Sequence, residues 1–101
     1  MPRVVHSMAL IRRVLNVLRT SNAGRGRELH VEGATQPFEF TSDPVLLRRV
    51  LVNLAKNALE AVPVGGVVTV GARREVDAVV FTVHNATVMP ADVQLQVFQR
   101  S

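Results

Sequence analysis

The spacing of apolar residues predicts two amphipathic helices. Between Ser7 and Arg19, apolar side chains recur at helical spacing and form a broad stripe. A second helix is predicted from Asp43 to about Val62. Asp43 is a good N-cap, Pro44 suits the first helical position, and a proline with two glycines follows the last turn. The apolar face expected for this second helix comprises Leu47, Val50, Leu51, Leu54, Ala58 and Ala61.

Alternating or continuous apolar runs predict strands between and after these helices. Short strands are expected around residues 29–31 and 38–40, and a hairpin of two longer strands at 67–74 and 78–85. The hairpin strands are almost continuously apolar, so both of their faces should be covered. A last helix is predicted over 90–98. The order predicts an α/β chain of the α+β type, a two-layer sandwich with helices on one face of a mixed sheet.

The composition narrows the class of protein. With 101 residues there is room for one domain, and 48% hydrophobic with 20% charged residues is a globular balance rather than a disordered one. No apolar run approaches the roughly 20 residues of a membrane span, and two arginines interrupt the first apolar stretch, which excludes a signal peptide. The absence of cysteine fits a cytoplasmic protein.

The net charge of +4 comes almost entirely from arginine, since Lys56 is the only lysine. One interpretation is an arginine-rich domain that binds nucleic acid, with the helix carrying Arg48 and Arg49 in a groove. The other is that these charges only solvate the surface. The second interpretation is favoured, because the chain has no Trp or Tyr on which bases could stack.

Three polar residues of the second helix are the first candidates for a site. Asn53, Asn57 and Glu60 follow at i, i+4 and i+7, and so share one stripe beside the expected apolar face. Asn is a poor residue for a helix interior, and a buried carboxamide without a partner costs roughly 1–3 kcal/mol. Hydrogen bonds to nearby backbone or water would be one explanation for this pair, and a ligand would be another.

The hairpin adds a fourth polar residue to this end of the chain. Alternation puts Val79, Phe81, Val83 and Asn85 on one face of the second hairpin strand. If that face meets the second helix, Asn85 emerges at the strand end near Asn57. One amide oxygen could then accept a hydrogen bond from the exocyclic amine of a purine, while another completes an oxygen shell around Mg²⁺.

The stretch Asp43–Ala61, D-P-V-L-L-R-R-V-L-V-N-L-A-K-N-A-L-E-A, resembles the N-box of sensor histidine kinases. These belong to the Bergerat-fold ATPases, with gyrase and the heat-shock chaperone ATPases. Residues 65–70 and 79–85 look like the next two strands of that family, leading into its first glycine box, and 90–98 like the helix before its phenylalanine box. The likeness implies a histidine-kinase-type ATP-binding domain over 23–101, preceded over 1–22 by the end of a dimerisation and phosphotransfer helix.

This resemblance also implies roles for individual residues. Asn57 matches the family's Mg²⁺-ligating asparagine, which bridges the metal to the ATP phosphates. Asn53 stands where hydrolytic relatives keep a glutamate as general base, and an amide cannot take that proton. Asn85 matches the aspartate that reads adenine. The implied cofactor-binding residues are therefore Asn53, Asn57, Glu60, Asn85 and Thr87, with Asn57 as metal ligand and no catalytic residue assigned.

The sequence also departs from the family's pattern. The glycine-box segment 85–90 has no glycine, and its Thr87 does not readily adopt a positive φ. Glu60 stands where many members carry a lysine facing the phosphates. The chain stops before the expected ATP lid, so it is expected to be a fragment that binds ATP weakly or not at all by itself.

The function implied by the resemblance is that of a cytoplasmic protein-histidine kinase of a two-component system. Such an enzyme binds Mg²⁺ and ATP and transfers the γ-phosphoryl group to a histidine. Its expected partners are ATP, a response regulator and a second copy bound through the N-terminal helix. Nucleic acid is not favoured, and no membrane contact is expected of this segment, whereas attachment of the full-length protein to a membrane stays open. The alternatives are a degenerate Bergerat-fold interaction module without catalysis and the arginine-rich nucleic-acid binder.

Overall fold

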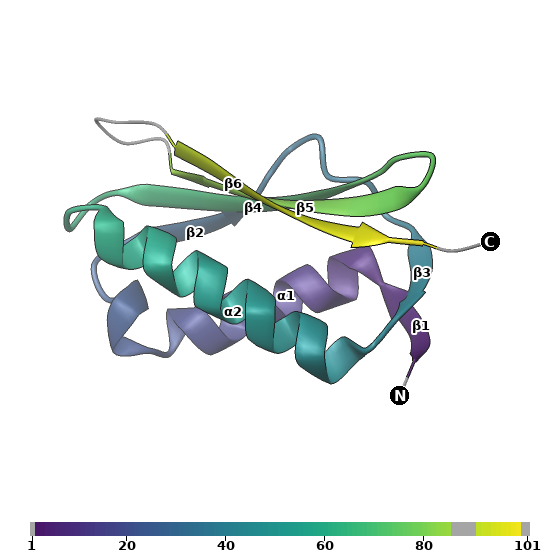
Figure 1. The fold of residues 1–101 in the computed structure, drawn as a ribbon. Coiled ribbons are helices and arrows are strands. Elements are labelled where there is room, and N and C mark those ends of the chain that lie inside the picture. Colours follow the sequence, from purple (N-terminus) through teal and green to yellow (C-terminus); the bar gives the residue numbers. More distant parts are fainter. Residues whose placement is uncertain (1, 86–90, 100–101) are drawn as a thin grey trace.

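Two helices packed on one face of a sheet make up the fold (Figure 1). The computed structural model describes residues 2–85 and 91–99. This arrangement is the two-layer α+β sandwich predicted from the sequence. The elements in chain order are β1 (Arg3–His6), α1 (Ser7–Arg19), a 3₁₀ turn (Asn22–Gly24), β2 (Glu28–Val31), β3 (Glu39–Ser42), α2 (Pro44–Ala61), β4 (Val67–Arg74), β5 (Ala78–Asn85) and β6 (Ala91–Phe98).

The main sheet has the strand order β2-β4-β5-β6. β2 runs parallel to β4, with Leu29 opposite Val68, whereas the pairs β4–β5 and β5–β6 are antiparallel. The predicted hairpin is therefore confirmed, and the sheet is mixed. β1 and β3 form a separate antiparallel pair in which Val5 lies opposite Phe40.

The helix predicted over 90–98 is wrong for the residues that the structure describes, because 91–98 form strand β6. Val93, Leu95 and Val97 alternate with polar residues, which is the period of a strand. In the β5–β6 register these three lie opposite Val83, Phe81 and Val79. Pairing with β6 also gives backbone partners to the edge of β5, which would otherwise be open.

The buried row of α2 differs from the expected apolar face. Leu47, Leu51, Ala55 and Leu59 are buried and belong to one core with the inward side chains of β4 and β5. Val50, Leu54 and Ala58 were expected in this row but are only half-buried, and Ala61 is exposed. The sheet thus contacts the residues of α2 that follow at intervals of four from Leu47 to Leu59. The other positions that were expected to be buried lie beside this row.

The apolar stripe of α1 is covered within the chain. Leu10, Ile11, Val14, Leu15 and Leu18 are buried in the same core as α2 and the sheet. A dimer contact through this helix would therefore have to use its exposed face. The domain boundary after residue 22 and the dimerisation role stay predictions.

The start of α1 is held by a buried hydroxyl. Ser7 is fully buried, and its Oγ donates a hydrogen bond to the Gln36 carbonyl at 2.8 Å. The same oxygen accepts one from the Phe38 backbone N–H at 3.0 Å. These bonds fix the β1–α1 junction against the segment that leads into β3 and α2.

Two substitutions on α2 test this packing. Leu51 is 0% exposed and Leu46 is 56% exposed on the same helix. Leu51→Ala should lower the free energy of unfolding by about 2–5 kcal/mol, because it leaves a cavity in the core. Leu46→Ala is the matched control and should change it by less than about 0.5 kcal/mol. Urea unfolding followed by circular dichroism measures both, and equal losses would contradict the packing described.

Candidate functional site

The helix that carries the candidate asparagines begins at a well-defined point. Oδ1 of Asp43 accepts hydrogen bonds from the backbone N–H groups of Val45 and Leu46, both at 3.1 Å. Pro44 occupies the first helical position, where no N–H is needed. The hydrogen bond from Leu46 is the largest cause that holds the pKa of the Asp43 carboxyl below its usual value. The predicted N-cap is confirmed.

The other end of α2 is fixed by a tight turn into β4. Gly65 has φ +91, and a Cβ on Gly66 would lie 2.7 Å from the Val62 Cβ, so this turn needs both glycines. The Arg27 side chain donates a hydrogen bond from Nε to the Val62 carbonyl at 2.8 Å. Because the chain reverses at once, β4 starts beside the last turn of the helix.

Asn53, Asn57 and Glu60 lie in one row on α2, as their spacing predicts. All three are exposed, so the row lies on the outer side of the helix rather than beside its buried face as expected. Among the described residues, none forms a hydrogen bond with the Asn57 carboxamide. Its oxygen and its NH₂ group are both accessible to a ligand.

Asn85 lies at the end of β5 and is half-buried. It pairs with Val68 near the start of β4 and shares a strand face with Val83, which belongs to the core under the helices. Asn85 is therefore on the helix side of the sheet. The end of β5 lies at the end of the sheet where α2 turns into β4 (Figure 1). Asn57, one turn before the end of α2, lies at the same end of the molecule. Thr87 falls outside the described residues.

The chemistry available at this end is that of amide oxygens. In the part of the chain that the structure describes, no group of three His, Cys, Asp or Glu side chains could hold a metal ion. A hard cation such as Mg²⁺ would take an amide oxygen here and complete its shell from water or ligand phosphates. Asn53 cannot act as a general base, and the exposed Glu60 is free to turn toward solvent.

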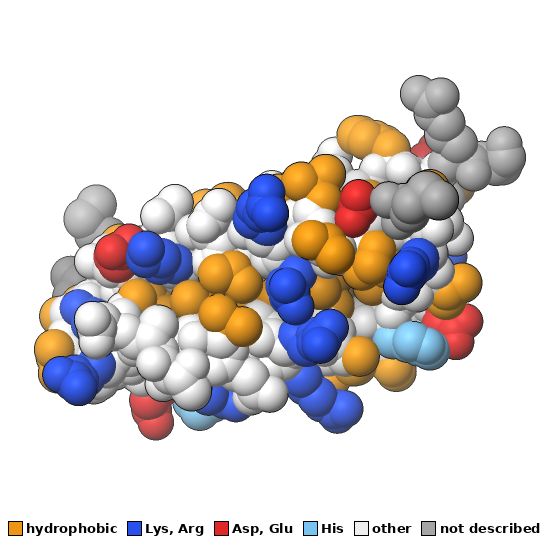
Figure 2. Space-filling view, turned by 90° about the horizontal axis from the view of Figure 1, so that it is seen from below, with side chains coloured by type: hydrophobic (Ala, Val, Ile, Leu, Met, Phe, Trp, Pro, Cys, Tyr) orange, Lys and Arg blue, Asp and Glu red, His pale blue; other side chains and the backbone are white. Residues whose placement is uncertain are grey.

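Asn53 also lines a surface hollow that the sequence analysis did not predict. This shallow hollow lies between α1 and α2 and is also lined by Val17, Val45, Arg48, Arg49 and Val52. The outer face of the two helices, which contains this hollow, has arginines around exposed aliphatic side chains (Figure 2).

Comparisons of the fold with solved structures give a consistent class. No family model matches the chain, and no curated protein matches it in sequence. The mycobacterial sensor histidine kinase MprB matches with a TM-score of 0.70 and 22% identity, over 84% of this chain and 55% of that one. A histidine kinase from Burkholderia phymatum STM815 matches with a TM-score of 0.76 and 22% identity, over 84% and 39%.

Further histidine kinase structures match to the same degree. The catalytic domain of histidine kinase ThkA matches with a TM-score of 0.73 and 21% identity, over 84% of this chain and 58% of that one. ThkA in complex with the response regulator protein TrrA matches with a TM-score of 0.71 and 21% identity, over 83% and 25%.

The chain therefore has the fold of a histidine kinase catalytic domain. The resemblance carried by the N-box and the predicted fold class are confirmed at this level. The chain spans between 39% and 58% of the lengths of MprB, the Burkholderia kinase and the ThkA catalytic domain. No helix among the described residues is long and apolar enough to cross a membrane.

The cap of α2 gives a prediction for stability and its pH dependence. Asp43→Ala should lower the urea midpoint, because two helix amides lose their acceptor. The folded-state pKa of Asp43 is lowered, so its charge contributes stability above the usual aspartate pKa, and this contribution is lost as pH falls through the folded value. Asp43→Asn keeps a capping oxygen without the charge. It should be more stable than Asp43→Ala and should lack that pH-dependent part, measured by urea unfolding at neutral and acidic pH. A pH dependence shared by Asp43→Asn would contradict this assignment.

Proposed function

We propose that this chain is part of the ATP-binding catalytic domain of a cytoplasmic sensor histidine kinase, which holds Mg²⁺ and ATP for transfer of the γ-phosphoryl group to a histidine. The observation that carries the proposal is the accessible carboxamide of Asn57 at the end of α2 where β5 brings Asn85. The histidine kinase fold supports the same proposal.

The asparagines of α2 would act at the phosphate end of the nucleotide. The oxygen of Asn57 would ligate Mg²⁺, and the metal would bridge to the phosphates. Asn53 lies one turn earlier and cannot remove a proton from water, which favours holding ATP over hydrolysing it. Catalysis would then depend on positioning and charge neutralisation rather than on an acid or base from this chain.

Asn85 and Thr87 would act at the base end. The Asn85 oxygen can accept a hydrogen bond from the exocyclic amine of adenine, without the charge-assisted strength of a carboxylate. Thr87 enters the proposal only through its place in the first glycine box. In this assignment Glu60 borders the phosphates and must turn away from them, since two negative groups repel.

Partners of the whole enzyme belong to the same proposal. The matching structure of ThkA with the response regulator protein TrrA supports a response regulator as partner. A homodimer through the N-terminal helix would use the exposed face of α1, because the apolar stripe of that helix is covered by α2 and the sheet.

One observation favours a second candidate, an interaction module that keeps the fold without binding nucleotide. Glu60 puts a carboxylate in the same exposed row as Asn57, three residues along the helix. That charge opposes phosphate binding at the place where the first candidate needs it. The two candidates differ in whether Mg²⁺ and ATP bind near Asn57.

Titration of the ¹⁵N-labelled chain with ATP, with and without Mg²⁺, separates the two candidates. We expect weak, saturable changes in amide shifts at the end of α2 and of β5 that require Mg²⁺. Asn57→Ala should weaken binding by about tenfold or more, because it removes a ligand to a charged group. The matched control is Asn16→Ala, which removes an exposed carboxamide from α1 and should leave the affinity unchanged.

The results against the kinase assignment are equally definite. No change up to several millimolar ATP, or binding that neither Mg²⁺ nor Asn57→Ala affects, would favour the interaction module. Thermal unfolding of each variant checks that the fold is intact, and both substitutions are at exposed positions.

A further inference from the structure

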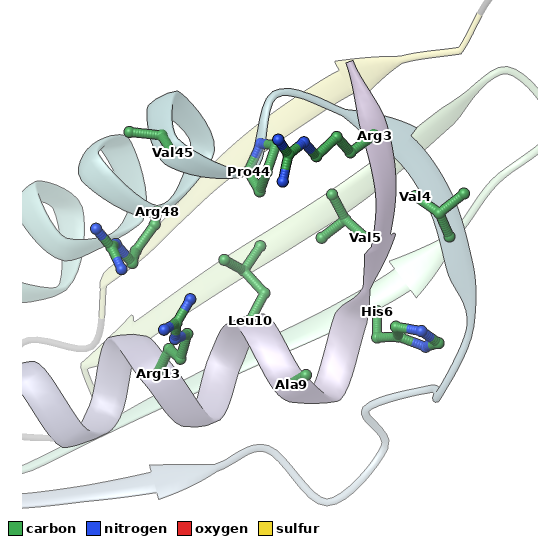
Figure 3. A pocket seen from close by; sticks show the side chains of 10 residues that line it. All are labelled: Arg3, Val4, Val5, His6, Ala9, Leu10, Arg13, Pro44, Val45 and Arg48. Atoms are coloured by element: carbon green, nitrogen blue, oxygen red, sulfur yellow. The ribbon is translucent and has the colours of Figure 1, made fainter. Parts of the chain in front are cut away.

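A cavity of about 290 Å³ lies at the end of α2 remote from Asn57. It is open to solvent and is bordered by β1, the first half of α1 and the first turns of α2, and Figure 3 shows its lining. We call it the arginine cavity, after Arg3 of β1, Arg13 of α1 and Arg48 of α2, which all line it. Val5 and Leu10 form its floor and are only 6% and 5% exposed.

The local sequence explains why these side chains converge. Strand alternation sends Arg3 and Val5 to the inner side of β1 and Val4 and His6 to the outer side (Figure 3). Pairing of β1 with β3 holds β1 beside the segment that leads into α2. Leu10 and Arg13 are three residues apart on α1, and so face the cavity together.

The lining of the cavity, as far as the structure describes the chain, contains three arginines and no carboxylate. Among the described residues, none forms a hydrogen bond or ion pair with Arg3, Arg13 or Arg48. Asp43 directly precedes the lining residue Pro44, and its carboxylate, whose Oδ1 caps α2, is the negative charge nearest to the cavity in sequence. His6 points to the other side of β1, where its Nδ1 lies 3.5 Å from the Glu39 carboxylate.

Some other arginines among the described residues have acceptors within the chain, whereas the exposed Arg12, Arg25 and Arg49 have none, as in the cavity. Arg19 donates a hydrogen bond to the Leu29 carbonyl at 2.7 Å, and Arg74 donates one to the Glu39 carbonyl at 2.9 Å. Arg73 pairs with Glu75 at 3.0 Å. Three unpaired guanidinium groups on one cavity repel each other, so an anion in their midst would relieve that repulsion.

We propose that the arginine cavity binds a small organic dianion. Guanidinium groups bind carboxylate and phosphate oxygens through paired hydrogen bonds, and three of them on different elements can hold two anionic groups. The apolar floor of Val5 and Leu10 suits a short aliphatic body between those groups. The volume is slightly below the usual range for ligand pockets, roughly 300–1,000 Å³, which favours a small molecule. The cavity lies apart from Asn57 and Asn85, so the proposal does not depend on nucleotide binding.

The test is titration of the ¹⁵N-labelled chain with glutarate, with inorganic phosphate and with sodium chloride at matched ionic strength. We expect saturable shift changes with glutarate around the cavity, weaker binding of phosphate and none with chloride. Arg48→Gln and Arg13→Gln should each weaken glutarate binding by about tenfold or more. Arg48→Lys keeps the charge and loses the planar fork, so it should also bind less tightly.

The matched controls each remove one positive charge, as the Arg48→Gln and Arg13→Gln variants do. Arg49→Gln and Arg12→Gln remove one exposed arginine from the same two helices, outside the cavity, and should leave the glutarate affinity within about twofold. Asn57→Ala should also leave it unchanged, so a failure of the nucleotide proposal does not affect this one. Thermal unfolding of every variant confirms the fold.

Three outcomes would overturn the proposal. Equal shifts with chloride, or equal losses in Arg49→Gln and Arg48→Gln, would show a general attraction of anions to a basic surface. Phosphate binding as tightly as glutarate would show an anion site with no preference for an organic body. Saturable binding of a glutamate-rich peptide but not of glutarate would assign the cavity to an acidic protein partner.

Discussion

The burial of one row of α2 sets the position of every other side chain on that helix. Leu47, Leu51, Ala55 and Leu59 follow at intervals of four and pack on β4 and β5. With this row inward, Asn57 has to be exposed, and Arg48 flanks the contact beside α1. The cap at Asp43 and the glycine turn after Val62 fix the two ends, so the helix can neither slide nor rotate without losing buried area.

The same constraint separates two polar regions along one helix. The end of α2 meets the start of β4, and the register of β4 with β5 brings Asn85 to that end. The beginning of α2 meets β1 and α1, and there three arginines surround a cavity with an apolar floor. One end offers neutral amide oxygens, which suit a hard cation, and the other offers guanidinium groups, which suit anions.

Local signals predicted both helices and the β4–β5 hairpin, whereas pairing between distant segments was not visible in the sequence. Strand β1 is only four residues long and exists by pairing with β3. For β6, the sequence analysis predicted a helix, but the alternation of Val93 and Leu95 with polar residues prevailed because β5 offered an open edge. In α2, apolar residues occupy both flanks of the buried row, so the sequence alone could not say which row the sheet would contact.

The exposure of Asn57 changes the argument for a ligand. A buried carboxamide would have required a partner, whereas an exposed one in mid-helix costs only about 0.7 kcal/mol or less in helix propensity. Residue type and spacing therefore do not by themselves indicate a ligand at Asn57. The argument for a ligand rests on the position of Asn57 in the fold, because the β4–β5 register places a second amide, that of Asn85, at the same end.

The arginine cavity, in contrast, could not be predicted from residue type and spacing at all. Its three arginines come from three elements and share no sequence pattern, and only the packing of β1, α1 and α2 places them on one cavity.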